Sequence, residues 1–153
     1  MKIIVDTNIV FSALLNSHGR IGRLLLDSRQ HVEFYSCKYL QTEVFRHLSK
    51  IQAHSKLQED EVLELLNLIA SRIFFVDENL LPKETLVQAT KLVVDIDFDD
   101  MVFVALTNHL NGFLWTGDKV LIEGLKRKGY QSVITTLELF LILGKTENYT
   151  ASN

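Results

Sequence analysis

Four acidic residues that lie far apart in the sequence could act together in one site. They are Asp6, Glu43, Asp100 and Asp118. Each stands at the end of an apolar, strand-like segment or in the first turns of the helix expected after one. In a parallel sheet these positions meet at the carboxyl edge, where ligands bind. Carboxylates gathered there make a site for hard divalent cations and therefore for phosphate chemistry.

Segments with strand and helix patterns alternate along the whole chain and would position these acids. The expected strands are Lys2–Val5, Glu33–Ser36, Phe74–Val76, Gly112–Trp115 and Ser132–Ile134. The expected helices are Ile9–Leu15, one around Ile21–Leu25, Tyr39–Leu48, Glu59–Ile73, Glu84–Val94, Met101–His109, Val120–Lys128 and Leu137–Leu143. This alternation predicts the α/β class, with a parallel sheet of about five strands sandwiched between helices.

The chain of 153 residues is expected to form one domain, since no linker or repeat interrupts it. The last helix is expected to end at Gly144. The polar segment Lys145–Asn153 is expected to fray. The predicted division is therefore a domain over residues 1–144 and a short tail over residues 145–153.

Composition bounds the location and the partners. Hydrophobic residues make up 47% of the chain and charged residues 23%, as in soluble globular proteins. The net charge of −3 provides no general basic field for nucleic acid, although metal ligands would contribute to that negative charge. Cys37 is the only cysteine, which excludes an intramolecular disulfide. We expect a cytoplasmic protein without a signal peptide or a membrane span.

Asp6 and Asp118 each have an alternative structural role as the cap of a following helix. Thr7 and Asn8 could cap the first helix equally well, so the chain does not need Asp6 for that purpose. Asp118 follows Thr116 and Gly117, a small-residue turn that would let a ligand approach the backbone. For Asp118 the two interpretations are about equally favoured.

Glu43 lies about one turn into its expected helix, among apolar neighbours. A buried carboxylate without a partner is costly, and a bound metal would offset that cost. The alternative is a solvated glutamate that pairs with Lys50 or His47. The sequence alone favours neither interpretation.

The densest acidic cluster has four acids in six residues, Asp95, Asp97, Asp99 and Asp100. These charges repel one another unless cations neutralise them. Asp100 is the preferred ligand because it directly precedes an apolar helix. Asp97 is a reserve ligand, whereas Asp95 and Asp99 are expected to be solvated or to cap that helix.

The identity of the metal follows from the ligand types. The five histidines are scattered, Cys37 stands alone, and the spacing typical of zinc sites is absent. The sequence also lacks the glycine-rich loops that cradle nucleotide phosphates. Ligation by oxygen alone predicts Mg²⁺ or Mn²⁺.

Four segments together resemble the PIN-domain family. They are Ile4–Ile9, Glu43, Asp99–Leu106 and Thr116–Lys119, and the resemblance extends from Lys2 to about Leu143. It implies a metal-dependent nuclease with a parallel sheet between helices. It also implies that Asp6, Glu43, Asp100 and Asp118 are the catalytic, metal-binding quartet, with Asn8 and Thr116 in support. The acidic run before Asp100 is richer than such a quartet needs, so Asp97 is a candidate for a further ligand.

The resemblance implies an endoribonuclease that hydrolyses RNA phosphodiester bonds and leaves 5′-phosphate and 3′-hydroxyl ends. Many bacterial members are toxins held by an antitoxin, so an antitoxin partner and a homodimer are expected. Substrate contacts would come from basic residues near the active edge, which could equally be solvating charges. These residues are Arg20, Arg23, Lys38, Arg46, Lys50 and Lys119.

Two other functions compete with this hypothesis. A haloacid-dehalogenase-like phosphatase also uses an aspartate after its first strand, but it needs a second acid where this chain has Asn8. A degenerate domain that binds RNA or protein without catalysis is the other alternative. The complete set of four acids argues against it.

Overall fold

Five parallel strands form the sheet of the computed structural model, which describes residues 1–28 and 32–150. The strands are β1 (Lys2–Val5), β2 (Glu33–Cys37), β3 (Ile73–Val76), β4 (Phe113–Trp115) and β5 (Val133–Ile134). Their order across the sheet is β3-β2-β1-β4-β5. Each agrees with a predicted strand to within one residue, and the predicted α/β architecture is confirmed.

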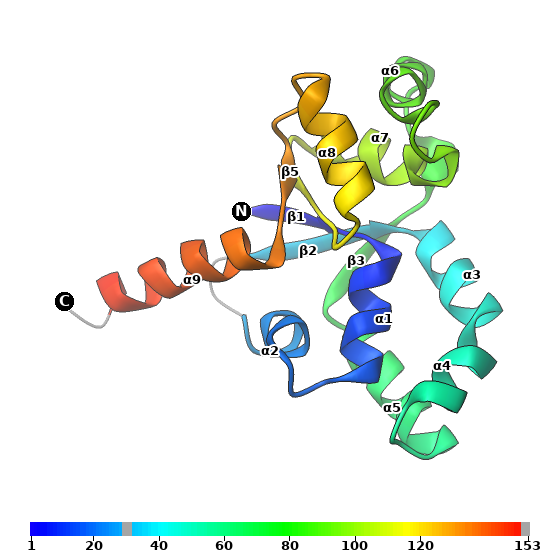
Figure 1. Ribbon diagram of the computed structural model, residues 1–153, viewed down its shortest axis with the longest axis vertical. Coiled ribbons are helices and arrows are strands. Elements are labelled where there is room, and N and C mark those ends of the chain that lie inside the picture. The colour runs from blue at the N-terminus through cyan, green and yellow to red at the C-terminus, as the bar shows by residue number, and fades with distance from the viewer. Residues whose placement is uncertain (29–31, 151–153) are drawn as a thin grey trace.

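Helices cover both faces of this sheet (Figure 1). Helices α6, α7 and α8 lie on one side, and α1, α2 and α5 lie on the other. The helices of the first half are α1 (Thr7–Leu15), α2 (Arg20–Asp27), α3 (Lys38–Arg46), α4 (Leu48–His54) and α5 (Glu59–Ala70). Those of the second half are α6 (Lys83–Val93), α7 (Met101–Leu110), α8 (Lys119–Arg127) and α9 (Thr136–Thr150), with short 3₁₀ turns η1 (Glu78–Leu80) and η2 (Phe98–Asp100).

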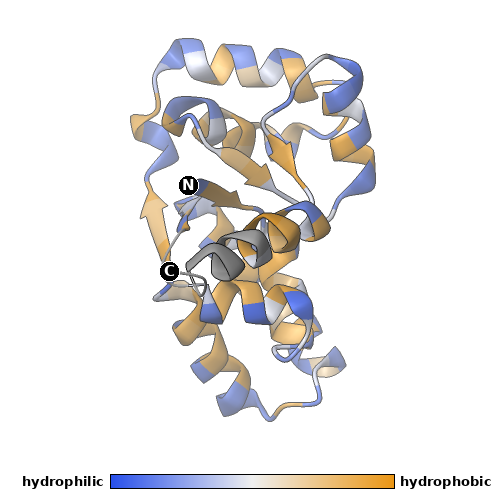
Figure 2. Ribbon diagram, turned by 90° about the vertical axis from the view of Figure 1, so that its left-hand side faces the viewer, coloured by the Kyte–Doolittle hydropathy of each residue, from blue (hydrophilic) through white to orange (hydrophobic). Residues whose placement is uncertain are grey.

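The central strands are mostly buried because helices pack on both faces of the sheet. Ile3, Ile4 and Val5 of β1 are fully buried, and Trp115 and Phe103 are the largest buried side chains. Figure 2 shows mostly hydrophobic strands between helices that alternate hydrophobic and hydrophilic residues along their length. Burial of each large apolar side chain stabilises the fold by about 1.5–3 kcal/mol.

Three predicted helix boundaries were wrong. The helix predicted over Tyr39–Leu48 is divided at His47, whose backbone N–H bonds to the carbonyls of both Glu43 and Val44. Helix α5 ends at Ala70 and not at Ile73, because Ile73 pairs with β2.

Helix α9 does not end at Gly144 but continues to Thr150. A glycine in a helix interior costs only about 1 kcal/mol relative to alanine, which neighbouring residues can offset. The end of the expected tail, residues 151–153, lies outside the described residues, and a domain boundary at residue 144 stays a prediction.

The order of the strands creates a crevice at the centre of the sheet. The chain runs outward from β1 through β2 to β3, then crosses to the other side of β1 to form β4 and β5. Such a reversal separates the loops after the two central strands, β1 and β4, and ligands of open α/β sheets bind there. Asp6 follows β1, and Thr116 to Asp118 follow β4.

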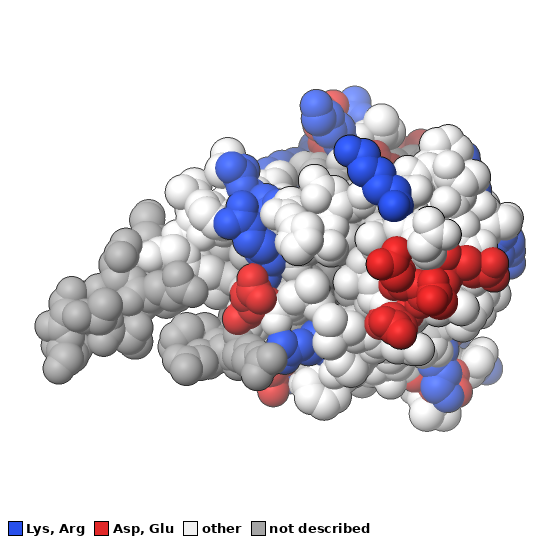
Figure 3. Space-filling view, turned by 90° about the horizontal axis from the view of Figure 1, so that it is seen from below, with Lys and Arg blue, Asp and Glu red and all other residues white. Residues whose placement is uncertain are grey.

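Another acidic surface lies away from this crevice. Figure 3 shows acidic side chains gathered on the face seen from below, and α5, whose first turn carries Glu59, Asp60 and Glu61, lies at the bottom of Figure 1. Glu61 completes a capping box with Gln58. These acids therefore stabilise the start of α5.

Among the described residues, no helix combines the length and apolar character needed to cross a lipid bilayer.

Gly112 lets β4 begin close to β1. A Cβ atom at this position would lie 2.5 Å from Ile4 Cδ1 and 2.8 Å from the Lys2 carbonyl oxygen. The latter is backbone and cannot move without disturbing β1. We expect Gly112→Ala to lower the free energy of unfolding by about 1–3 kcal/mol. Chemical denaturation would measure this loss.

Gly144→Ala is the matched control, because a Cβ there would meet nothing within 4 Å and the residue lies inside α9. That substitution should leave stability unchanged or raise it by about 0.5–1 kcal/mol. Equal effects of the two substitutions would contradict the close packing of β4 on β1.

Candidate metal centre

Asp6 is the most deeply placed of the predicted acids. Its side chain is only 4% exposed, at the end of β1, and it makes no capping hydrogen bond to α1. Its Oδ2 atom accepts hydrogen bonds from the Thr116 hydroxyl at 2.6 Å and from the Asn8 amide at 2.7 Å. The structure therefore does not support the cap interpretation of Asp6. The carboxylate is held in the crevice instead.

Asn8 and Thr116, the predicted supporting residues, join the two central strands. The Asn8 Nδ2 atom also donates to Thr116 Oγ1 at 3.0 Å, and its Oδ1 atom accepts from the Gly117 backbone N–H at 2.9 Å. Thr116 Oγ1 in turn accepts from the Asp118 backbone N–H at 3.1 Å. This network fixes the turn after β4 against the start of α1, and it orients Asp6 between them.

Glu43 reaches the same edge from α3. It is partly buried, and its Oε2 atom accepts a short hydrogen bond from the Thr7 hydroxyl. Thr7 directly follows Asp6, so this contact places Glu43 beside the first acid. The alternative partners of Glu43, Lys50 and His47, are not needed to explain its position.

Asp118 carries out the capping role that the sequence left open. Its Oδ1 atom accepts from the backbone N–H groups of Val120 at 2.8 Å and Leu121 at 3.1 Å at the start of α8. The cap uses only Oδ1, and Oδ2 lies outside it. One carboxylate can therefore stabilise α8 and still offer an oxygen to a cation.

Asp100 lies at the end of η2 and the start of α7, and its side chain makes no capping hydrogen bond. Asp97 is exposed and caps η2, since its Oδ1 atom accepts from the Asp99 backbone N–H at 3.0 Å. Asp95 forms a short ion pair with Lys128, the residue that follows α8. Asp95 thus has a cationic partner outside the site.

Helix α8 also holds the acidic segment in place through Gly124. A Cβ at Gly124 would overlap the side chain of Ile96, so the glycine lets Ile96 pack directly on α8. The Lys128–Asp95 ion pair lies on the same side. These two contacts fix the backbone that leads from Asp95 to Asp100.

Two of the acids at this edge, Asp6 and Asp100, have raised pKa values. Burial, opposed by the hydrogen bond from Thr116 and assisted by the charges of Glu43 and Asp118, raises the pKa of Asp6 to about 6. Burial and the charges of Asp6, Asp97, Asp118 and Glu43 raise the pKa of Asp100 to about 8. The four predicted acids therefore share one electrostatic environment, together with Asp97.

This environment fits a divalent cation. The ion pairs of the described residues are Lys38–Asp77, Lys126–Glu138 and Lys128–Asp95, so basic side chains neutralise none of the four acids. Buried carboxylates without a cationic partner are unfavourable, and Mg²⁺ or Mn²⁺ is bound by such oxygen atoms.

The side chains are not arranged around a metal position in the structure as it stands. Among the described residues, no three Asp, Glu, His or Cys side chains enclose such a position. Glu43 is turned toward Thr7, and Asp118 toward the backbone of α8. Mutual repulsion also keeps uncompensated carboxylates apart. Binding a cation therefore requires side-chain rotations at this edge.

Sequence reasoning missed Thr7. Its hydroxyl belongs to the site because it holds Glu43, yet in the sequence a threonine after Asp6 only indicates a helix start. Its position next to Asp6 was the one signal that pointed to this edge. The partner on α3 becomes visible only when β1 and β2 pair.

These pKa shifts predict how stability depends on pH without metal. The carboxyls of Asp6 and Asp100, with ordinary values of 3.8, hold protons in the folded protein that the unfolded chain releases. Their contribution to the free energy of unfolding therefore falls as pH rises from about 4 through 8. At about pH 8.5 in EDTA, Asp100→Asn should be more stable than the natural sequence by on the order of 1–3 kcal/mol.

Thermal unfolding at about pH 5 and 8.5 would measure this difference, with the neighbouring exposed Asp99→Asn as the control. Added Mg²⁺ or Mn²⁺ should stabilise the natural sequence more at the higher pH, because metal binding requires the deprotonated carboxylates. The raised pKa values would be contradicted if the free energy of unfolding of the natural protein rose between about pH 5 and 8.5 as steeply as that of Asp100→Asn.

The chain resembles one protein in sequence and two solved structures in fold. The chain is 27% identical over 125 residues to the uncharacterized protein MJ1680 of Methanocaldococcus jannaschii. The aligned region covers 80% of this chain and 74% of that protein. The crystal structure of PAE2754 from Pyrobaculum aerophilum superposes with a TM-score of 0.66 at 15% identity, over 95% of this chain and 96% of the other.

A second solved structure is VapBC2 from Rickettsia felis bound to a DNA fragment from their promoter. It superposes with a TM-score of 0.60 at 17% identity, over 88% of this chain and 98% of the other. The family model of the PIN domain matches residues 4–138. This match includes all four acids at the carboxyl edge of the sheet, and it confirms the resemblance found in the sequence. The chain belongs to the PIN-domain family.

Proposed function

We propose that this protein is a Mg²⁺- or Mn²⁺-dependent endoribonuclease. The observation that supports the proposal most strongly is the convergence of Asp6, Glu43, Asp100 and Asp118, without a basic partner, on the crevice between β1 and β4. Membership of the PIN-domain family supports the hydrolysis of nucleic acid phosphodiesters. RNA as the substrate comes from the same family resemblance.

The four acids would hold the cation, and Asp97 would join them as a further ligand. Asn8 and Thr116 would keep Asp6 Oδ2 in one orientation, and Thr7 would do the same for Glu43. A bound divalent cation supplies a Lewis acid and lowers the pKa of a coordinated water molecule. Water then adds across the phosphodiester, so that phosphorus gains the hydroxyl and the 3′ oxygen leaves with the proton.

The cysteine near this edge is not suited to act as a covalent nucleophile. Cys37 ends β2 but is fully buried, and burial raises the pKa of its thiol to about 12. The thiolate is therefore negligible at neutral pH. A phosphatase of the haloacid-dehalogenase type would need an acid at Asn8, which here donates and accepts hydrogen bonds that hold the site together.

Conservative substitution of the acids tests this function. We expect Asp6→Asn and Asp100→Asn to lower the cleavage of labelled single-stranded RNA in Mg²⁺ or Mn²⁺ by at least about 100-fold, because each removes a charge on which cation binding depends. EDTA should abolish cleavage by the natural sequence. Gel separation of the labelled products would measure both effects.

Asp99→Asn is the matched control, since its side chain is exposed and adjacent to Asp100, and it should cleave normally. Cleavage that persists in EDTA or in both substituted proteins would refute the metal mechanism. Release of phosphate from a small monoester with RNA intact would favour the phosphatase. RNA binding without any cleavage would favour the non-catalytic alternative.

We also propose that the protein is the toxin of a toxin–antitoxin pair. The VapBC2 complex shares its fold, and a hollow between α3 and α5 offers a surface to an amphipathic antitoxin helix. Apolar side chains line most of this hollow, among them Val44, Leu66 and Phe45, and Phe45 is 64% exposed. A cytoplasmic location and a homodimer are further expectations of this role.

Phe45→Glu should disrupt antitoxin binding, because it places a charge on the apolar hollow. Co-purification with the tagged product of the adjacent gene would measure this loss, and RNA cleavage by the isolated variant should persist. Val87→Glu is the control, since Val87 is a similarly exposed apolar residue on α6, in the opposite layer. Unchanged co-purification of Phe45→Glu would exclude this surface.

A further inference from the structure

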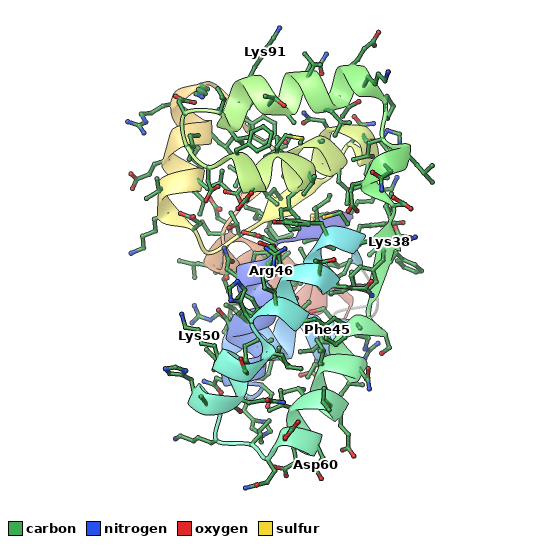
Figure 4. All side chains as sticks on the ribbon, turned by 90° about the vertical axis from the view of Figure 1, so that its right-hand side faces the viewer. Lys38, Phe45, Arg46, Lys50, Asp60 and Lys91 are labelled. Carbon is green, nitrogen blue, oxygen red and sulfur yellow. The ribbon has the colours of Figure 1, made fainter. Side chains whose placement is uncertain are left out.

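One face of α3 carries three polar side chains toward the acidic edge. Tyr39, Glu43 and Arg46 are separated by four and three residues, so they lie on the same side of the helix. The contact between Glu43 and Thr7 turns this side toward Asp6. Figure 4 shows Arg46 at the middle of the molecule, where α3 faces the layer of α6 and α7.

Arg46 is anchored beside the acids through Tyr39. The Tyr39 ring packs against Phe103 of α7, with ring centroids 6.4 Å apart. Burial and the charges of Glu43 and Asp99 raise the pKa of Tyr39, whereas the Arg46 guanidinium lies close enough to the Tyr39 hydroxyl to lower it. Arg46 itself is exposed. An exposed guanidinium is therefore held at the mouth of an acidic crevice.

Two other basic residues near this edge already have partners. Lys38 pairs with Asp77 at 3.2 Å, and Arg20 lies over the Phe140 ring at 5.0 Å. Of the basic residues considered for substrate binding, Arg46 is the one that lies on the same side of α3 as Glu43.

We propose that Arg46, positioned by Tyr39, binds a backbone phosphate of the RNA next to the scissile one. A polyanionic substrate must approach a cluster of carboxylates, and a nearby cation would offset the repulsion that remains around the metal. A guanidinium presents paired donors that match two phosphate oxygens, which a lysine cannot reproduce. The proposal rests on the ribonuclease function proposed above.

Arg46 also has a simpler structural role to be separated from this one. It lies in the last turn of α3, where a cation suits the helix dipole. That role predicts a small change in stability and no change in substrate affinity. A lysine would fill it equally well.

Steady-state cleavage of a labelled single-stranded RNA in Mg²⁺ separates the two roles. We expect Arg46→Gln to raise KM about tenfold with kcat changed less than about twofold, as for loss of one charge-assisted contact. The slope of log kcat/KM against log salt should become shallower by about 0.7, the value for one phosphate contact on a single strand. Arg46→Lys should restore the salt slope and only part of KM.

Tyr39→Phe keeps the ring on Phe103 and removes the hydroxyl, and it should raise KM about two- to threefold. The control is Lys91→Gln, which removes an exposed cation on α6 far from the site (Figure 4) and should change neither KM nor the salt slope. Melting temperatures would verify that each variant is folded.

The outcomes distinguish a failure of the Arg46 proposal from a failure of the proposed ribonuclease function. If the natural protein cleaves RNA while Arg46→Gln retains its KM and salt slope, Arg46 does not bind the substrate, although the nuclease function stands. Full recovery of KM by Arg46→Lys would show that a single positive charge is enough, and it would overturn the paired guanidinium contact. If the natural protein does not cleave RNA in either metal, the proposed function fails and this inference fails with it.

Discussion

The burial of the Asp6 carboxylate between two parallel strands is the constraint around which the candidate site is arranged. A charge in this position has little access to water, and its hydrogen bonds come from Asn8 and Thr116 on the two sides of the crevice. Those hydrogen bonds also join the turn after β4 to the start of α1. The local stability of the central strands and the orientation of the first acid thus depend on the same atoms.

The sheet order explains why the other acids gather around Asp6. Glu43 comes from the helix after β2, Asp118 from the turn after β4, and Asp100 from the start of α7. The layers on the two faces of the sheet each contribute to one crevice (Figures 1 and 4). Repulsion among these acids opposes the folded state without metal, which is a common consequence of assembling a reactive site.

The strands could be predicted from the sequence because short apolar segments alternate with longer helical patterns along the whole chain. Helix ends were harder to predict. The apolar pattern continues through His47 without showing that the backbone breaks there, and Gly144 does not terminate α9. Local patterns report which face of a segment is buried, but a boundary also depends on what the neighbouring elements allow.

Asp6 and Asp100 could be proposed from their positions after apolar segments or before an apolar helix, although their pKa values depend on charges from distant segments. The role of Thr7 could not be predicted, because it depends on how α3 is turned toward β1. Arg46 could be named only as one of six basic residues near the active edge. The sequence shows the spacing of Tyr39, Glu43 and Arg46. It does not show which side of the helix faces the crevice.

The two oxygens of Asp118 place that position under two different selective pressures. Oδ1 caps α8, which packs on the acidic segment at Ile96, so the residue serves folding in addition to its proposed role in binding a cation. The Asp100 side chain caps no helix, and at neutral pH without metal it lowers the free energy of unfolding. A descendant that lost its enzymatic activity would therefore be expected to discard Asp100 early and to retain Asp118. Divergence at these two positions would then record the order in which a lineage gave up its chemistry and kept its architecture.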